Sequence, residues 1–222
     1  RPRSQEVLAE ARQLLFAGEY VEAERLIDSE FLGPEPLERS YQTLGDLLLD
    51  FGEGAEITDY RRELSLDSAV ARVTYRHDGV RITRVVFASA PDAAIVVRVE
   101  CDQACPAFDV ALTRPADANV EAAGDNGLRM FGQASHEGRN PGSRFEAQLE
   151  VRPEGAGRVT SNDDGGLRVE DAQAVTLFLT AATDYWGDDP QEAARQRLER
   201  VAQRDYHTLR ADHVADHQHW FD

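Results

Sequence analysis

Lysine is absent from this sequence of 222 residues, so all 24 basic residues are arginines, and they face 41 aspartates and glutamates. The formal net charge of −17 argues against nucleic acid as a partner, because a surface of this charge repels phosphates. We interpret the missing lysine together with the acid excess as adaptation to high salt, which screens self-repulsion. A GC-rich genome is the alternative explanation for the missing lysine alone.

Long apolar runs are also missing. No run approaches the ~20 residues that a helix needs to cross a membrane, so we expect no membrane partner. No signal peptide precedes the first predicted helix, and the sequence leaves the localisation of the protein unknown.

Cysteine is scarce, since Cys101 and Cys105 are the only two, which is too few for a disulfide scaffold. They flank three residues of a predicted loop. A small local bridge and a pair of free thiols near a turn are about equally consistent with this spacing. A zinc site would need two further ligands nearby, and no histidine stands close in the sequence. We therefore predict no metal and no cofactor.

The first 33 residues carry two helical patterns. Apolar positions from Val7 to Leu15 follow helical spacing, and Gly18 ends this first helix. A second helix is predicted from Tyr20 to Ile27, and the Gly- and Pro-rich residues 33–36 break the chain after it. No second copy of the pattern exists, which excludes a helical solenoid. We predict a helical pair over residues 1–33, inserted in or packed on the domain that follows.

The middle of the chain has the patterns of consecutive antiparallel strands. Apolar and polar residues alternate from Leu64 to Tyr75, and Asp78-Gly79 supplies a tight hairpin turn into residues 80–87. Residues 94–99 form an apolar run interrupted only by Arg98, which is typical of a strand buried in a sandwich.

Further short strand patterns follow. They cover residues 108–112, 128–133, 145–151, 157–160, 167–169 and 174–181. Residues 115–127 are acidic and have no strand pattern, and residues 135–143 are predicted to be a loop. Many short strands with Gly/Asp turns between them predict a mainly β fold, a large antiparallel β-sandwich over residues 34–186.

The tail, residues 187–222, changes to helical patterns. Asp188-Asp189-Pro190 begins one helix and Tyr206 begins a second, and we interpret both as linker helices. His213 and His217 stand four apart, which suggests a metal pair. Without the intervening glutamate of metalloproteases this pattern is weak. We expect His213 to pack between sandwich and helix, and the other histidines to be solvated.

Catalytic motifs are missing as well. Carboxylates are so numerous that no glycosidase pair can be selected from them, and neither a G-x-S-x-G elbow, a phosphate loop nor a dinucleotide fingerprint occurs. We predict no catalytic residue in this chain.

Three segments carry a resemblance to a known family. They are SYQxLGDLxLDF at residues 40–51, TDYRRELxLDxAxxRVTY at residues 58–75 and RxVFASAPDxxIVVRV at residues 84–99. Their order and spacing resemble the amino-terminal β-domain of glycoside hydrolase family 95, the α-L-fucosidases. The helical stretch Leu8–Leu32 and the tail Asp205–Phe221 also look like family segments.

The resemblance implies a supersandwich-type domain without catalytic residues. The family usually begins with strands that contain a Gly-Asn-Gly turn, upstream of the helical pair. Its catalytic centre lies downstream in a helical (α/α) barrel, where a glutamate acts as general acid and an asparagine–aspartate arrangement activates water. The chain stops before any such barrel and is expected to be a fragment or a truncated relative. The implied partners are that barrel, in cis or trans, and a fucosylated glycan as substrate of the whole enzyme. The alternative is a self-standing carbohydrate-binding module.

Three residues are candidates for a substrate rim. Tyr41 and Gln42 precede a buried strand, and an aromatic ring with an amide is a plausible sugar-contacting pair. The simpler alternative is a tyrosine packed over the sheet and a glutamine closing a turn. Trp186 follows the last buried strand beside Tyr185. It would serve either as a sugar platform or as a plug between domains, and we favour the plug.

Overall fold

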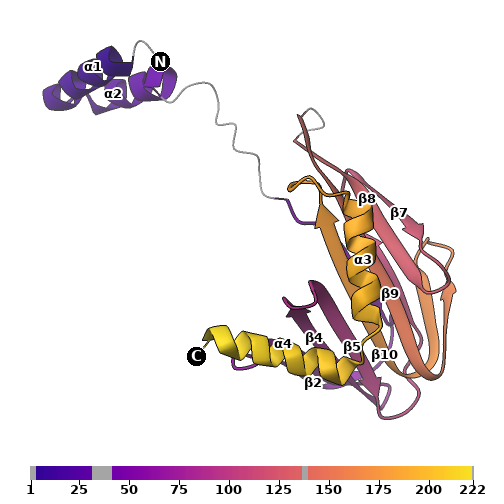
Figure 1. Cartoon of the computed structure of the whole chain (residues 1–222). Coiled ribbons are helices and arrows are strands. Elements are labelled where there is room, and N and C mark those ends of the chain that lie inside the picture. Colours follow the sequence, from indigo (N-terminus) through magenta and orange to yellow (C-terminus); the bar gives the residue numbers. More distant parts are fainter. Residues whose placement is uncertain (1–3, 32–41, 137–139, 222) are drawn as a thin grey trace. The chain divides into compact units, whose positions relative to one another are not determined.

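The computed structural model describes residues 4–31, 42–136 and 140–221 (Figure 1). The chain divides into two compact units, Arg1–Tyr41 and Gln42–Asp222.

The first unit is the predicted helical pair. Helix α1 spans Ser4–Ala17, α2 spans Tyr20–Leu26, and a short π-helix, η1, follows at Ile27–Phe31. Gly18, with a φ of +84°, makes the turn between the two helices, as predicted. The small contact between them buries Val7, Ala11 and Ala23. The packing of this unit on the sandwich stays a prediction.

The second unit confirms the predicted mainly β, antiparallel fold. Its ten strands are β1 (Asp46–Asp50), β2 (Ile57–Ser65), β3 (Val70–His77), β4 (Val80–Ser89), β5 (Ala94–Cys101), β6 (Phe108–Thr113), β7 (Ala118–Ala122), β8 (Gly127–His136), β9 (Asn140–Ser161) and β10 (Leu167–Thr183). The main order in the sheet is β2-β3-β4-β5-β10-β9-β8-β7. Strand β6 also pairs with β10, and β1 pairs with β6.

Strand β10 holds the two layers of the sandwich together. Its Val169 pairs with Phe108 of β6, whereas Ala174 pairs with Glu100 of β5, so both strands use one edge of β10 in succession. The register of β10 against β9 shifts between residues 170 and 174, which marks bulges where the strands bend. The pair β1–β6 therefore leaves the plane of the main sheet and packs over it.

Close contacts confirm this packing. A Cβ on Gly45, just before β1, would lie 2.5 Å from the Thr113 carbonyl oxygen and 2.7 Å from Met130 Cε of β8, so only glycine fits there. The ring of Phe51 stacks on Phe108 at 4.6 Å and meets Tyr75 of β3 edge-on. The main hydrophobic core lies between these layers.

Two helices cover the outer face of the main sheet (Figure 1). Helix α3 spans Pro190–Ala202, and Asp189 caps it by accepting a hydrogen bond from the Glu192 N–H at 3.0 Å, so the predicted Asp-Pro start is confirmed. Helix α4 spans Tyr206–Phe221. A second apolar cluster joins the helices to the sheet; it contains Val70, Val85, Phe87, Ala94, Val96, Phe178, Val201 and Leu209.

Two histidines of α4, His213 and His217, contact the turn between β2 and β3. His213 is buried, stacks on Phe87 at 4.8 Å, and places Nε2 3.1 Å from the Ser68 carbonyl oxygen, which confirms its predicted packing role. His217 was expected to be solvated, and this is wrong: it is half-buried, with Nε2 2.8 Å from the Leu66 carbonyl oxygen. Within the residues that the structure describes, no three His, Cys, Asp or Glu side chains gather as metal ligands.

Other local expectations also need correction. The acidic stretch 115–127 contains an edge strand, β7, and residues 145–160 lie in one strand rather than two, as do residues 167–181. Strand residues replace most of the loop expected at 135–143, of which 137–139 lie outside the described residues. Leu64, in the edge strand β2, and Leu66, in the turn after it, are not core residues, because both are more than 60% exposed.

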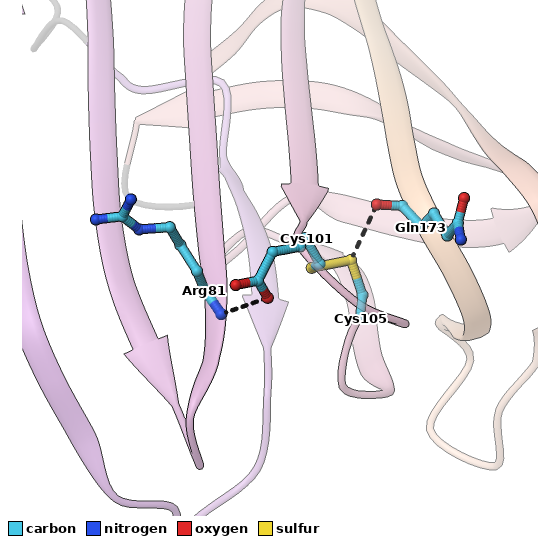
Figure 2. The surroundings of a disulfide bond; sticks show 5 residues. Arg81, Cys101, Cys105 and Gln173 are labelled. Atoms are coloured by element: carbon cyan, nitrogen blue, oxygen red, sulfur yellow. Dashed lines mark hydrogen bonds between the residues drawn. A yellow bond between two sulfur atoms is a disulfide. The ribbon is translucent and has the colours of Figure 1, made fainter.

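Cys101 and Cys105 form a disulfide bond, which decides between the two alternatives that the sequence left open (Figure 2). None of the described helices is long and apolar enough to span a membrane.

Candidate functional site

Gln42 lies at one end of the sandwich and is held there by its amide. Nε2 donates to the Ser135 carbonyl oxygen at 2.6 Å, and Oε1 accepts from Arg114 Nη2 at 2.7 Å. Arg114 follows β6 directly and also donates to the carbonyl oxygens of Thr43 and Leu44. Arg114 therefore holds the segment before β1 at the end of β6, and Gln42 links that segment to the end of β8.

The same end is shaped by close backbone packing around Arg114. The guanidinium lies over the ring of Phe145 in β9, with Cζ 4.8 Å from the ring centroid. Asp117 accepts hydrogen bonds from the Ser135 N–H and hydroxyl at 3.0 and 2.8 Å. This approach requires glycine at position 132, where a Cβ would lie only 1.8 Å from the Asp117 carbonyl oxygen.

A turn after β10 presents two aromatic side chains at this end. The Gly187 N–H donates to the Asp184 carbonyl oxygen at 2.9 Å and closes the turn. Asp184 is fixed by Arg144, whose N–H and Nε donate to its carboxylate at 2.9 and 3.0 Å. Tyr185 and Trp186 stand at the tip, 71% and 85% exposed, with their rings edge-to-face at 4.8 Å.

The structure thus brings two of the three predicted rim residues to the same end of the sandwich. Arg114 joins Gln42 to Phe145, and Phe145 pairs across the sheet with Thr183, just before the turn that carries Trp186. Tyr41 lies outside the described residues. Their role at a substrate rim stays a prediction.

Sequence reasoning missed the residues that build this end. Arg114, Asp117, Arg144 and Asp184 carry no motif, and their partners are distant along the chain. The nearest available signal was position, because each of them stands at or near the end of a strand. Such a signal does not distinguish them from the many other charged residues of this sequence.

The chemistry available here suits recognition better than bond cleavage. The carboxylates of Asp117 and Asp184 are committed to Ser135 and Arg144, while the two aromatic rings are open to solvent. Exposed rings and amide groups bind sugars or apolar protein surfaces.

A second ionic cluster on β8 and β9 is buried. Glu146 is 2% exposed and accepts two hydrogen bonds from Arg129, at 2.9 and 3.0 Å, and one from Gln148. The bond to Glu146 raises the pKa of Arg129. Both oxygens of Glu146 are thus engaged by this arginine, so the cluster fixes the two strands together.

Comparison with known proteins agrees with this architecture. The chain is 30% identical to α-L-fucosidase 2 of Arabidopsis thaliana over 254 aligned positions, which cover 99% of the chain and 29% of that protein. It is also 30% identical to a probable α-fucosidase A of Aspergillus niger, over 86% of the chain and 26% of that protein. The chain therefore spans less than a third of the length of these relatives.

A solved structure shares the fold. It is described as a kojibiose phosphorylase from the human microbiome, and it matches 75% of the chain and 25% of its own length with a TM-score of 0.55 and 12% sequence identity. An antiparallel sandwich of this type is thus also found within a larger carbohydrate-active protein.

The fold and these relatives define the class: an amino-terminal β domain of a glycoside hydrolase. The model of the family "Glycosyl hydrolase family 65, N-terminal domain" matches residues 1–188, and the chain belongs to this family. The resemblance to the amino-terminal domain of α-L-fucosidases is confirmed.

Proposed function

We propose that this chain is the non-catalytic amino-terminal β-sandwich of an α-L-fucosidase-like hydrolase. Its role is to support, and partly to wall, the active site of a helical (α/α) barrel that acts in cis or in trans on fucosylated glycans. Two relatives at 30% identity are named α-fucosidases, and each is more than three times as long as the part that the chain matches.

The observation that carries the proposal is the exposed pair Tyr185–Trp186. Two large rings at 71% and 85% exposure stand on a turn that Asp184 and Arg144 hold in place. Exposed aromatic side chains on a fixed turn are suited to contact with another domain or with sugar rings. Gln42 lies at the same end of the sandwich, where its amide is bonded to Ser135 and Arg114.

The competing function is a self-standing carbohydrate-binding module. The same aromatic pair favours it, but the broad outer face of the main sheet is covered by α3 and α4. A module that binds glycans on a concave sheet face would need that face open. We therefore favour the supporting role.

Activity of the isolated chain is the first test. Purified alone, the chain should not hydrolyse aryl α-L-fucosides, because it contributes no catalytic pair. Hydrolysis by this polypeptide that disappears when one of its own carboxylates is mutated would overturn the proposal. Binding of fucosylated glycans by the isolated chain, measured by calorimetry, would favour the competing module.

The second test separates the roles of Trp186 in the longer enzyme that the proposal implies. If Trp186 lines the rim, Trp186→Ala raises KM for fucosides and leaves the melting temperature unchanged. If it is a plug, the same variant lowers the melting temperature and leaves KM unchanged. Trp220→Ala is the matched control, because Trp220 is equally exposed, at 81%, but lies on α4. A Trp186→Ala enzyme that matches the wild type in both measurements would remove Trp186 from the proposal.

A further inference from the structure

The disulfide stands where the chain crosses from one layer of the sandwich to the other. Strand β5 ends at Cys101, and the chain must then reach Phe108, the start of β6, on the same edge of β10. In β10 this crossing lies opposite residues 170–173, between the parts that pair with β6 and with β5. These residues carry the bulges of the strand, so regular ladder pairing does not hold the crossing.

Cys105 anchors the crossing to the bulge. Its N–H donates to the Ala172 carbonyl oxygen at 2.7 Å, and its sulfur lies 3.6 Å from the Gln173 carbonyl oxygen (Figure 2). The side chain is 6% exposed and belongs to the main core. The bulge and the crossing are therefore joined at one buried point.

Cys101 is held from the opposite side, by β4. It pairs with Ile82 in the sheet, and the next residue, Asp102, accepts a hydrogen bond from the Arg81 N–H at 2.9 Å. The Asp102 N–H donates back to the Arg81 carbonyl oxygen at 3.2 Å. The bridge therefore couples the β4–β5 pair to the bulge of β10 through a ring of only five residues.

We infer that this disulfide is a structural lock on the β5–β6 crossing, and that the protein matures in an oxidising compartment. Disulfides of this kind form and persist outside the reducing cytosol. Both cysteines of the chain are used in the bridge, so no competing thiol is left. In the closing step the two thiols lose two electrons and two protons to a disulfide-bearing oxidant, which is reduced to its dithiol while the new S–S bond forms.

The redox state of the protein provides the first test. The chain is expressed once with export to the bacterial periplasm and once in the reducing cytosol, and thiols are alkylated during lysis. Intact mass should show no alkylation of the exported protein and two alkylated thiols in the cytosolic protein. Two reactive thiols in the exported protein would overturn the lock, and a bridge already complete in the cytosol would overturn the inference about the compartment.

The second test measures what the bridge does. Reduction of the purified protein should increase the unfolded-to-folded ratio by about 30-fold, the value expected for a five-residue ring. Hydrogen exchange should accelerate at the Cys105 amide and in β6 more than in β3, which lies two strands away from Cys101 in the sheet. The double variant Cys101→Ser/Cys105→Ser should have the stability and exchange of the reduced protein, and reductant should change neither.

Asp102→Asn is the matched control for these measurements. It weakens the same loop without touching the sulfurs, so it should remain sensitive to reductant. If the serine variant does not fold, comparison of the oxidised and reduced wild-type protein still tests the inference. Unchanged stability and exchange on reduction, or equal acceleration in β3 and β6, would contradict a local lock.

Discussion

Replacing Arg98 with methionine should loosen the contact between the sheet and its covering helices. The Arg98 side chain, in β5, is only 7% exposed. It donates to both carboxylate oxygens of Glu154, to Glu100 at 3.1 Å and to Thr176 at 2.8 Å. Its guanidinium also lies 5.1 Å from the ring centroid of Tyr206, the first residue of α4.

The expected loss is about 2 kcal/mol of unfolding free energy, below the 3–5 typical when a fully buried charge is left unpaired. The reason is that the side chains of Glu154 and Glu100 are 53% and 46% exposed, so water can solvate both carboxylates when the arginine is gone. Methionine fills much of the same volume. For a domain of this size the loss corresponds to a melting temperature lower by about 4–8 °C.

Urea denaturation at several pH values is the measurement. The hydrogen bond from Arg98 lowers the pKa of Glu154 below its ordinary value. Because the unfolded chain binds this proton more tightly, the stabilisation is complete above the unfolded pKa, about 4.3, and is lost as the pH falls through the lower folded pKa. The stability gap between wild type and Arg98→Met should therefore narrow below about pH 4.

Arg62→Met, a change at an exposed arginine of β2, is the control and should leave stability within about 0.5 kcal/mol. The reasoning is refuted if Arg98→Met is as stable as the wild type at neutral pH. It is also refuted if the gap stays constant as the carboxylates are protonated.

Two further predictions concern packing and charge. Gly132→Ala should lower the free energy of unfolding, measured by urea denaturation, by about 3 kcal/mol, because the new Cβ overlaps the Asp117 carbonyl. In the control Gly124→Ala the new Cβ meets no neighbouring atom, and the loss should be about 1 kcal/mol because φ is +73° there. Equal costs for the two would contradict the close approach. The net charge of −17 predicts that the melting temperature continues to rise as potassium chloride is increased well above about 0.15 M. Sulfate is compared separately, because it also strengthens apolar burial. A melting temperature that stays flat up to molar chloride would leave genome composition as the explanation for the missing lysine.

The sequence predicted those elements whose signals lie within a few neighbouring residues. The Asp78-Gly79 turn, the strand at residues 94–99, which is buried except for Ile95, and the Asp-Pro start of α3 are confirmed, because turn geometry, burial and capping each act within a few residues. Strand β7 was missed even though its five residues alternate, because it is short, almost fully exposed and lies in an acidic stretch at the edge of the sheet. Strands β9 and β10 were each divided in two, because Gly155, Gly157 and the bulged residues interrupt their pattern without ending their pairing.

The candidate site could be predicted only in part. Gln42 and Trp186 were selected for their chemistry, but their common location depends on the register of β6, β8, β9 and β10, which no local pattern contains. The bridge between Cys101 and Cys105 likewise depends on how β5 and β6 share an edge of β10.

That shared edge has a consequence for synthesis of the chain. Strand β10 is the last strand of the described sandwich in chain order, yet it pairs with β5, β6 and β9. Until it leaves the ribosome, the strands β2–β5 and β7–β9 exist as two separate antiparallel groups, with β5 and β9 as open edges. Open edges of this kind pair readily with other nascent chains. The nascent polypeptide is therefore open to self-association until β10 pairs with the earlier strands. A chain truncated anywhere before Leu167 keeps these edges open permanently.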